Sequence, residues 1–255
     1  MTPQEALVEQ RLTDALNLQT AVVRDDPADA AALLFLFELQ TVANRFREAW
    51  QTVNAIVSPD PAWPKALKWY RRLLRSAHAR ARGRRPAFVN ETPRHATRRW
   101  RAIRANPPAR ALDLIDRADH ATPHVLGHID GREFDGLRDA DDRFASVLEA
   151  FIGGQYVWLP FEQLRRVTIA PATRLLESAY RPARVRLSDG EEANAILPLI
   201  YPGSDSADVF LLGTETDHVN PDGGPVRCVG GKLLLVGEEE LALGEVRQLD
   251  IKAWV

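Results

Sequence analysis

The chain has 255 residues, of which 45% are hydrophobic and 27% are charged, and its formal net charge is −2. These values are typical of a folded globular protein and exclude a disordered or fibrous chain. No stretch approaches the roughly 20 apolar residues of a membrane-spanning helix, and the polar N-terminal residues do not resemble a signal peptide, so we expect a cytoplasmic protein without a membrane segment. The single cysteine, Cys228, cannot form an internal disulfide or a thiolate zinc site.

The first segment of the chain is predicted to be helical and to contain a repeat with a period of 34 residues. At this offset Ala15 aligns with Ala49, and Pro27 aligns with Pro61. In a tetratricopeptide helix pair, which has this period, a small residue lets the helices approach and a proline closes the second helix. Asn44 is expected in a turn, where it can adopt the left-handed conformation. Chance periodicity in an ordinary helical hairpin is the alternative.

Three further helices are predicted from helical spacing and from the residues that stop them, over 65–82, 93–105 and 108–118. The segment that holds them is strongly basic. From Pro61 to Arg110 the sequence has thirteen arginines and two lysines against one acidic residue, Glu91. Such a block is typical of a docking surface for an acidic protein or nucleic acid, or of a face neutralised by the chain's own acidic flanks. The candidate partner-binding residues are Arg71, Arg72, Arg75, Arg98 and Arg99.

The pattern changes after a predicted loop over 120–131. A helix is expected to begin at Asp139 or Asp141, and Gly153-Gly154 would end it. Its apolar side would be formed by Phe144, Val147, Leu148, Phe151 and Ile152. Strands are predicted over 156–159, 183–187, 195–201, 232–236 and 249–253, while 205–231 has no clear pattern. The sequence therefore predicts an α+β protein, with a helical tetratricopeptide-like region over 1–121 and a smaller mixed α/β domain with a mainly antiparallel sheet over 122–255.

Common catalytic motifs do not occur in this sequence. At the nearest candidate for a phosphate-binding loop, Gly230-Gly231-Lys232, Leu233 stands where a hydroxyl would hold magnesium. A dinucleotide-binding fingerprint and a glycine-flanked nucleophilic serine are also missing. Cys228 is predicted to be a small buried strand residue rather than a reactive thiol. We therefore predict no catalytic residue and no cofactor.

Three histidines form the best metal-binding candidate. His120, His124 and His128 are spaced four apart, so that neutral imidazoles on one helical face could ligate zinc. Pro123 and Gly127 argue against a continuous helix there. We therefore predict no metal site, and a metal-dependent hydrolase at these histidines is kept as an alternative.

A set of residues between 129 and 204 resembles one known family. These signature residues, which occur in order and at matching spacing, are Ile129, Asp130, Gly131, Phe134, Asp139, Asp141, Arg143, Tyr156, Trp158, Pro160, Phe161, Tyr201, Pro202 and Gly203. They resemble the signature of the ImpE family, also called TagJ or SciE-type virulence proteins, which are accessory proteins of bacterial type VI secretion. The helical first half, with its degenerate repeat, is also similar to that of the family.

The resemblance implies a non-enzymatic adaptor. Family members are similar in binding the N-terminal helix of the small sheath subunit, TssB, and in some systems the disassembly ATPase ClpV. Stacked helix pairs commonly present a groove for such a partner helix. The alternative from the residues alone is a helical-repeat module that binds nucleic acid through the arginines, which we consider the weaker interpretation because Trp69, Tyr70 and Trp100 have the spacing of core residues.

Overall fold

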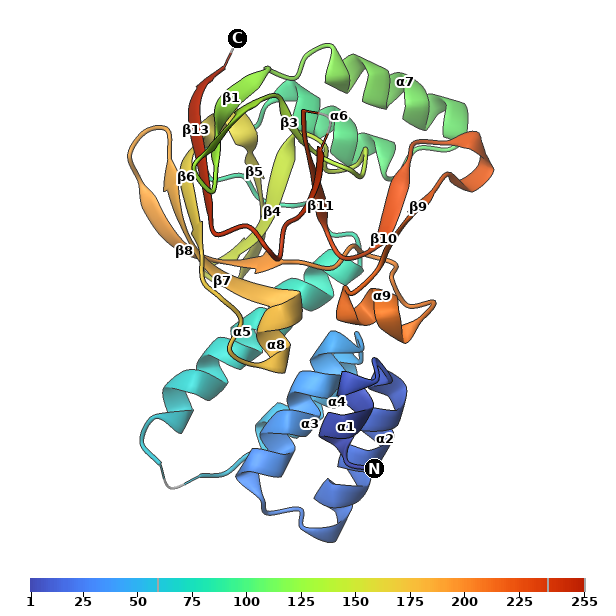
Figure 1. Ribbon diagram of the computed structural model, residues 1–255, viewed down its shortest axis with the longest axis vertical. Coiled ribbons are helices and arrows are strands. Elements are labelled where there is room, and N and C mark those ends of the chain that lie inside the picture. Colours follow the sequence, from blue (N-terminus) through green and yellow to red (C-terminus); the bar gives the residue numbers. More distant parts are fainter. Residues whose placement is uncertain (59, 238, 255) are drawn as a thin grey trace.

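The computed structural model describes residues 1–58, 60–237 and 239–254. The N-terminal helices form one end of the molecule, and the strands lie at the other, so the fold is α+β as predicted (Figure 1). The α-helices are α1 (Pro3–Val8), α2 (Leu12–Asp25), α3 (Ala30–Val42), α4 (Phe46–Ala55), α5 (Trp63–Ala81), α6 (Arg94–Ala102), α7 (Pro108–Asp119), α8 (Leu175–Ala179) and α9 (Asp208–Leu212). Within the described residues, no helix is both long and apolar enough to span a membrane.

The N-terminal helices begin and end where local chemistry requires it. Thr2 and Glu5 form a capping box at α1, and Asp29 accepts hydrogen bonds from two backbone N–H groups at the start of α3. Asn44 has a φ of 57° between α3 and α4, as predicted. Helices α2 to α5 contact one another in chain order, and Ala15 and Ala49 are both fully buried. Both positions are therefore buried, and the tetratricopeptide-like nature of the repeat stays a prediction.

Every strand pair in the three sheets is antiparallel. The main sheet has the order β2-β1-β13-β6-β7-β8-β4-β5, while β12-β11-β3 and β10-β9 form two smaller sheets. The strands are β1 (Val125–Ile129), β2 (Arg132–Asp135), β3 (Leu137–Asp139), β4 (Val147–Ile152), β5 (Gln155–Pro160), β6 (Leu164–Ile169), β7 (Tyr180–Leu187), β8 (Glu192–Pro198), β9 (Thr216–Val219), β10 (Arg227–Gly230), β11 (Leu233–Val236), β12 (Glu239–Ala242) and β13 (Gln248–Trp254). Short 3₁₀ turns occupy Phe161–Gln163 and Pro221–Gly223.

Two predicted elements are wrong. The expected helix after Asp139 is instead a turn followed by β4, whose side chains are buried on both faces. The expected loop over 120–131 contains β1, in which Val125, Gly127 and Ile129 are buried in alternation. The segment 205–231, for which no structure was predicted, forms α9 and the β9–β10 hairpin.

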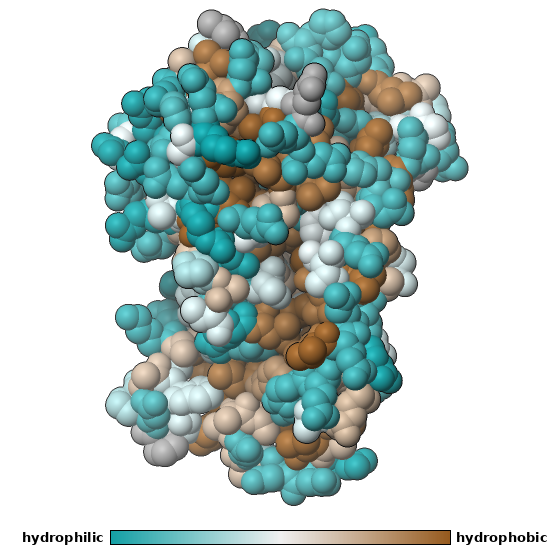
Figure 2. Space-filling view, viewed as in Figure 1, coloured by the Kyte–Doolittle hydropathy of each residue, from teal (hydrophilic) through white to brown (hydrophobic). Residues whose placement is uncertain are grey.

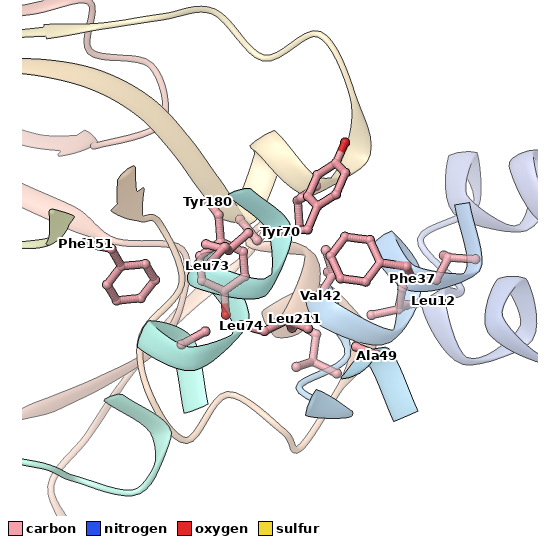
Figure 3. Packing of buried hydrophobic residues seen from close by; sticks show 14 of the residues in the cluster. Leu12, Phe37, Val42, Ala49, Tyr70, Leu73, Leu74, Phe151, Tyr180 and Leu211 are labelled. Carbon is pink, nitrogen blue, oxygen red and sulfur yellow. The ribbon is translucent and has the colours of Figure 1, made fainter. Parts of the chain in front are cut away.

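The hydrophobic core has two main parts. One lies between the helices and the main sheet, where Leu73 and Leu74 of α5 pack near Phe151 and Tyr180 (Figure 3). The other draws buried side chains from all eight strands of the main sheet. On the face seen in Figure 2, hydrophobic residues gather between the helical end and the β part. Helix α5 runs from the helical end to the sheet and so connects the two (Figure 1).

Helices α6 and α7 lie beside the β part rather than with the first five helices (Figure 1). The α6 residue His95 hydrogen-bonds to Ser146 and Glu162, and Arg99 donates to the backbone carbonyl of Asp142. The division at residues 121 and 122 stays a prediction.

Candidate functional site

Four charged side chains form a buried cluster where α5 meets the sheet. This buried charge cluster consists of Arg80 on α5, Asp139 at the end of β3, Glu149 on β4 and Lys232 just before β11. The Nη2 atom of Arg80 lies 2.6 Å from Glu149 Oε2, and Lys232 Nζ lies 3.2 Å from the same oxygen and 2.9 Å from Asp139 Oδ2. Arg80 is 9% exposed and the other three side chains at most 4%. Two cations thus neutralise two anions out of water.

Aromatic side chains complete the cluster. Tyr201 donates a 2.6 Å hydrogen bond to Asp139, Tyr156 donates one to Glu149, and Trp158 donates one of 2.6 Å to the Tyr156 hydroxyl. Lys232 Nζ lies 4.2 Å from the ring centroid of Phe144. Burial, reinforced by the neighbouring carboxylates, raises the pKa of both tyrosines well above the usual value, so their hydroxyls remain donors.

The other signature residues shape turns and strand ends. Asp141 accepts the backbone N–H of Cys228 at 2.8 Å and pairs with Arg143 at 2.5 Å. Asp130 and Gly131 have positive φ in the β1–β2 hairpin turn, and Asp130 also accepts the backbone N–H of Gln248 at 2.7 Å. Buried or turn-forming positions are held by Ile129, Phe134, Pro160, Phe161, Pro202 and Gly203. The signature therefore specifies the architecture of the β part.

The pKa values of the two carboxylates in the buried charge cluster shift in opposite directions. Burial alone would raise the pKa of Glu149, but the two adjacent cations and the hydrogen bonds outweigh it and lower that pKa to about 2. Burial raises the pKa of Asp139, and the negative charge of nearby Asp141 adds to this increase. The positive charge of Lys232 offsets the increase only in part. Glu149 is therefore the more strongly held anion.

Acid is expected to weaken the fold through Glu149. In the unfolded chain the pKa of Glu149 is about 4.3, which is higher than its pKa in the folded protein. The carboxylate therefore makes its full contribution to the free energy of unfolding above the unfolded pKa, and this contribution is lost as pH falls toward about 2. This lowering of the Glu149 pKa on folding corresponds to about 3 kcal/mol in the free energy of unfolding. Asp139 changes the free energy of unfolding with pH in the opposite direction. Because its pKa is raised in the folded protein, it stabilises the fold at low pH, and this stabilisation is lost as pH rises through the folded pKa.

The measurement is denaturant unfolding in pH steps from about 7 to about 2.5 on the wild type and on Glu149→Gln. The free energy of unfolding should fall less with acid in the variant, because only the wild type can protonate Glu149. Equal falls in the two proteins would contradict the role assigned to this carboxylate.

The five candidate partner-binding arginines do not form one surface. Arg99 is 1% exposed; it donates to Ser146 and to the Asp142 carbonyl and pairs with Asp119. Its assignment to a docking surface is thus wrong, because its guanidinium holds α6 against the β part. Arg71 donates to Asn54 and Arg98 to the carbonyl of Arg117, both within the helical layers. Arg72 and Arg75 are exposed on α5.

Two hollows lie beside these exposed arginines. The α5 groove, of about 680 Å³, is lined by α5 and by the sheet, with Trp69, Leu73, Phe151 and Ile196 among its apolar residues. The basic pocket, of about 490 Å³, is lined by Arg75, His78, Arg82, Arg84, Arg85 and the adjoining β4–β5 turn. Ser76 and Gly154 line both hollows, so the two adjoin along α5. An apolar groove that runs into a cationic pocket is suited to binding an acidic, amphipathic segment.

The three histidines have separate partners. His120 hydrogen-bonds to the Asp116 carbonyl, His124 to Asp135, and His128 lies 3.4 Å from Lys252 Nζ. Across 1–58, 60–237 and 239–254, the structure brings together no group of three or more His, Cys, Asp or Glu side chains that could hold a metal ion. This geometry does not support the alternative of a hydrolase at these histidines.

Arg80, Glu149 and Lys232 were missed by the sequence analysis. Glu149 and Lys232 each carry a charge within or beside a run of apolar residues, over 147–152 and 232–236. An isolated charge at a core position requires a buried partner, which is the signal that could have identified them. Cys228 is fully buried in β10, as predicted, and burial raises the pKa of its thiol to about 12.

Known proteins are similar to this chain in sequence and in fold. Residues 131–250 match the model of the ImpE protein family. The type VI secretion system accessory component TagJ of Pseudomonas aeruginosa is 28% identical over 264 residues, which cover 99% of this chain and 92% of TagJ. The crystal structure of protein VPA1032 from Vibrio parahaemolyticus shares the fold, with a TM-score of 0.90, 24% identity and coverage of 98% of this chain and 97% of that one. The resemblance drawn from the signature residues is thus confirmed: the chain is similar to the ImpE family over residues 131–250 and to TagJ over nearly its whole length.

Proposed function

We propose that this protein is an accessory component of a bacterial type VI secretion system that acts as an adaptor. The observation that carries the proposal is the likeness to TagJ, which extends over 99% of the chain and so includes the helical end as well as the matched ImpE region. The structure of VPA1032 shares the fold of this chain over 98% of its length, so the similarity of fold also includes both the helical end and the β part.

The polar residues of the signature are consistent with an adaptor that has no catalytic activity. Asp139 and Asp141 are buried, and each is paired with a cation that is itself buried or nearly so. The thiol of Cys228 is held in its neutral form by burial. Such groups stabilise the fold and are not available to a substrate, which favours a protein that works by binding.

The partner we propose is the N-terminal helix of the TssB-like small sheath subunit, as the family resemblance implies. Three or four apolar anchors, each contributing about 1.5 to 3 kcal/mol of burial before the entropy of ordering is subtracted, give a micromolar dissociation constant. The disassembly ATPase ClpV is the second partner implied by the resemblance. An adaptor that links the sheath to the ATPase needs a binding surface for each of these two proteins and does not need a catalytic site.

Isothermal calorimetry with the N-terminal peptide of the cognate small sheath subunit tests the proposal. We expect saturable binding with a micromolar dissociation constant, and no binding of a peptide of the same composition in scrambled order. Equal heats for the two peptides, with a protein shown by circular dichroism to be folded, would contradict the adaptor function. A pull-down with purified ClpV, with and without the sheath subunit, tests the second partner.

A further inference from the structure

The α5 groove and the basic pocket differ sharply in chemistry although they adjoin. The lining of the groove is mainly apolar, with Trp69, Leu73 and Phe151 among its residues, and Arg72 is its one charged residue among those described. The basic pocket is lined by four arginines and one histidine, and among its described lining residues there is no Asp or Glu. Along α5, Trp69 and Arg82 are thirteen residues apart, which corresponds to about 20 Å at a helical rise of ~1.5 Å per residue. One surface of this length therefore passes from apolar to cationic.

The arginines of the basic pocket are not neutralised within the fold. Arg75, Arg82, Arg84 and Arg85 are exposed, and none of them forms an ion pair with a carboxylate among the residues that the structure describes. Arg85 lies over the ring of Trp100, 5.6 Å from its centroid, and Arg75 donates a hydrogen bond to the backbone carbonyl of Arg71. This contrasts with Arg80, Arg99 and Arg143, which all have carboxylate partners. The positive charge of the pocket is thus available to an external anion.

Ser76 marks the junction of the two hollows. Its side chain is 1% exposed, and its hydroxyl oxygen has no hydrogen-bond partner among the described residues. A buried hydroxyl without a partner destabilises the protein, and a hydrogen bond to a polar group of a bound partner would remove that cost. Because Ser76 lines both hollows, that group would lie where the apolar part of the surface meets the cationic part.

We propose that this continuous surface is the docking site for an amphipathic helix with an acidic end, whose apolar side occupies the α5 groove and whose carboxylates enter the basic pocket. The inference rests on the proposed function, because it assigns the place and the charge of the partner helix. Leu73 and Trp69 precede Arg82, the residue that directly follows α5, by nine and thirteen residues, or about two and a half and three and a half helical turns. A helix lying along α5 must therefore carry its carboxylates at least two turns from its apolar anchors.

The test compares three variants with the wild type, using the N-terminal peptide of the cognate small sheath subunit. Arg82→Gln/Arg84→Gln removes two charges from the basic pocket, Trp69→Ala shortens an apolar anchor, and Arg24→Gln/Arg110→Gln removes two charges from exposed positions on α2 and α7. We expect the first two variants to bind at least tenfold more weakly and the control pair to bind as the wild type does. The loss in Arg82→Gln/Arg84→Gln should shrink as salt rises, because salt screens exposed charges.

The outcomes separate the docking site from the proposed function. If the wild type does not bind the peptide, the proposed function fails. If the wild type binds and both Arg82→Gln/Arg84→Gln and Trp69→Ala bind equally well, the docking site is wrong while the adaptor function stands. The assignment of carboxylates to the basic pocket is wrong if a peptide whose acidic residues are changed to amides binds as tightly as the unmodified peptide. It is also wrong if the cognate helix has no such acidic residues. A DNA duplex that displaces the peptide at physiological salt would make this a nucleic-acid surface instead.

Discussion

Replacing Glu149 with glutamine is expected to lower the free energy of unfolding by about 3–5 kcal/mol. Glutamine keeps the shape of the side chain but removes the anion that lies between Arg80 and Lys232. Asp139 would then be the one carboxylate left to compensate two buried cations in the cluster. Urea unfolding followed by tryptophan fluorescence measures the loss as a lower midpoint at a similar slope.

Two comparisons show that charge rather than packing causes this loss. In Arg80→Met/Glu149→Gln one cation and one anion are both removed, which leaves the Lys232–Asp139 pair intact, so the double variant should be more stable than Glu149→Gln alone. Glu239→Gln breaks the exposed pair with Arg132 and should cost at most about 1 kcal/mol. A double variant less stable than the single one would contradict this explanation.

Gly127→Ala is expected to destabilise the protein by about 4 kcal/mol or more, or to prevent folding. A β-carbon at this position would lie 1.9 Å from the backbone oxygen of Asp250 on β13 and 2.8 Å from the Phe134 ring. The oxygen belongs to the neighbouring strand, so relief requires β1 and β13 to separate. Thermal unfolding should show a melting temperature at least about 8 °C lower, at roughly 2–4 °C per kcal/mol for a domain of this size.

Gly83→Ala is the matched control for Gly127→Ala. Gly83 has a φ of 60° after α5, but a β-carbon there meets no atom within 4 Å. Its cost is only the backbone strain of a left-handed alanine, about 1–2 kcal/mol. A Gly127→Ala protein as stable as Gly83→Ala would show that the two strands adjust at little cost.

Elements with local signals could be predicted from the sequence. Pro64 and Pro108 lie in the first turns of α5 and α7, and the apolar residues of α5 recur at helical spacing, so the bounds of both helices were nearly correct. The strand β4 could not be recognised in this way. Phe144, Val147, Leu148, Phe151 and Ile152 match helical spacing, but a strand buried on both faces also gives a continuous apolar run, and periodicity cannot separate the two.

The site was predictable only in part. The signature residues indicate the resemblance to the ImpE family, yet their role in the buried charge cluster depends on partners far apart in the chain. Arg80 and Glu149 are 69 residues apart, and Asp139 and Lys232 are 93 apart. No local pattern joins such residues. The arginine block was noticed as a whole, but only the fold separates Arg99, which is buried, from Arg72 and Arg75, which are exposed.

The position of β13 in the main sheet has a consequence for biosynthesis. This strand follows every other strand of that sheet in the sequence, yet it pairs with β1 on one side and β6 on the other. During translation the sheet therefore remains divided into the β1–β2 hairpin and a separate group of strands until residues 248–254 have left the ribosome. One edge of β1 and one edge of β6 stay open until then, so nascent chains would expose two unpaired strand edges to other nascent chains and to chaperones.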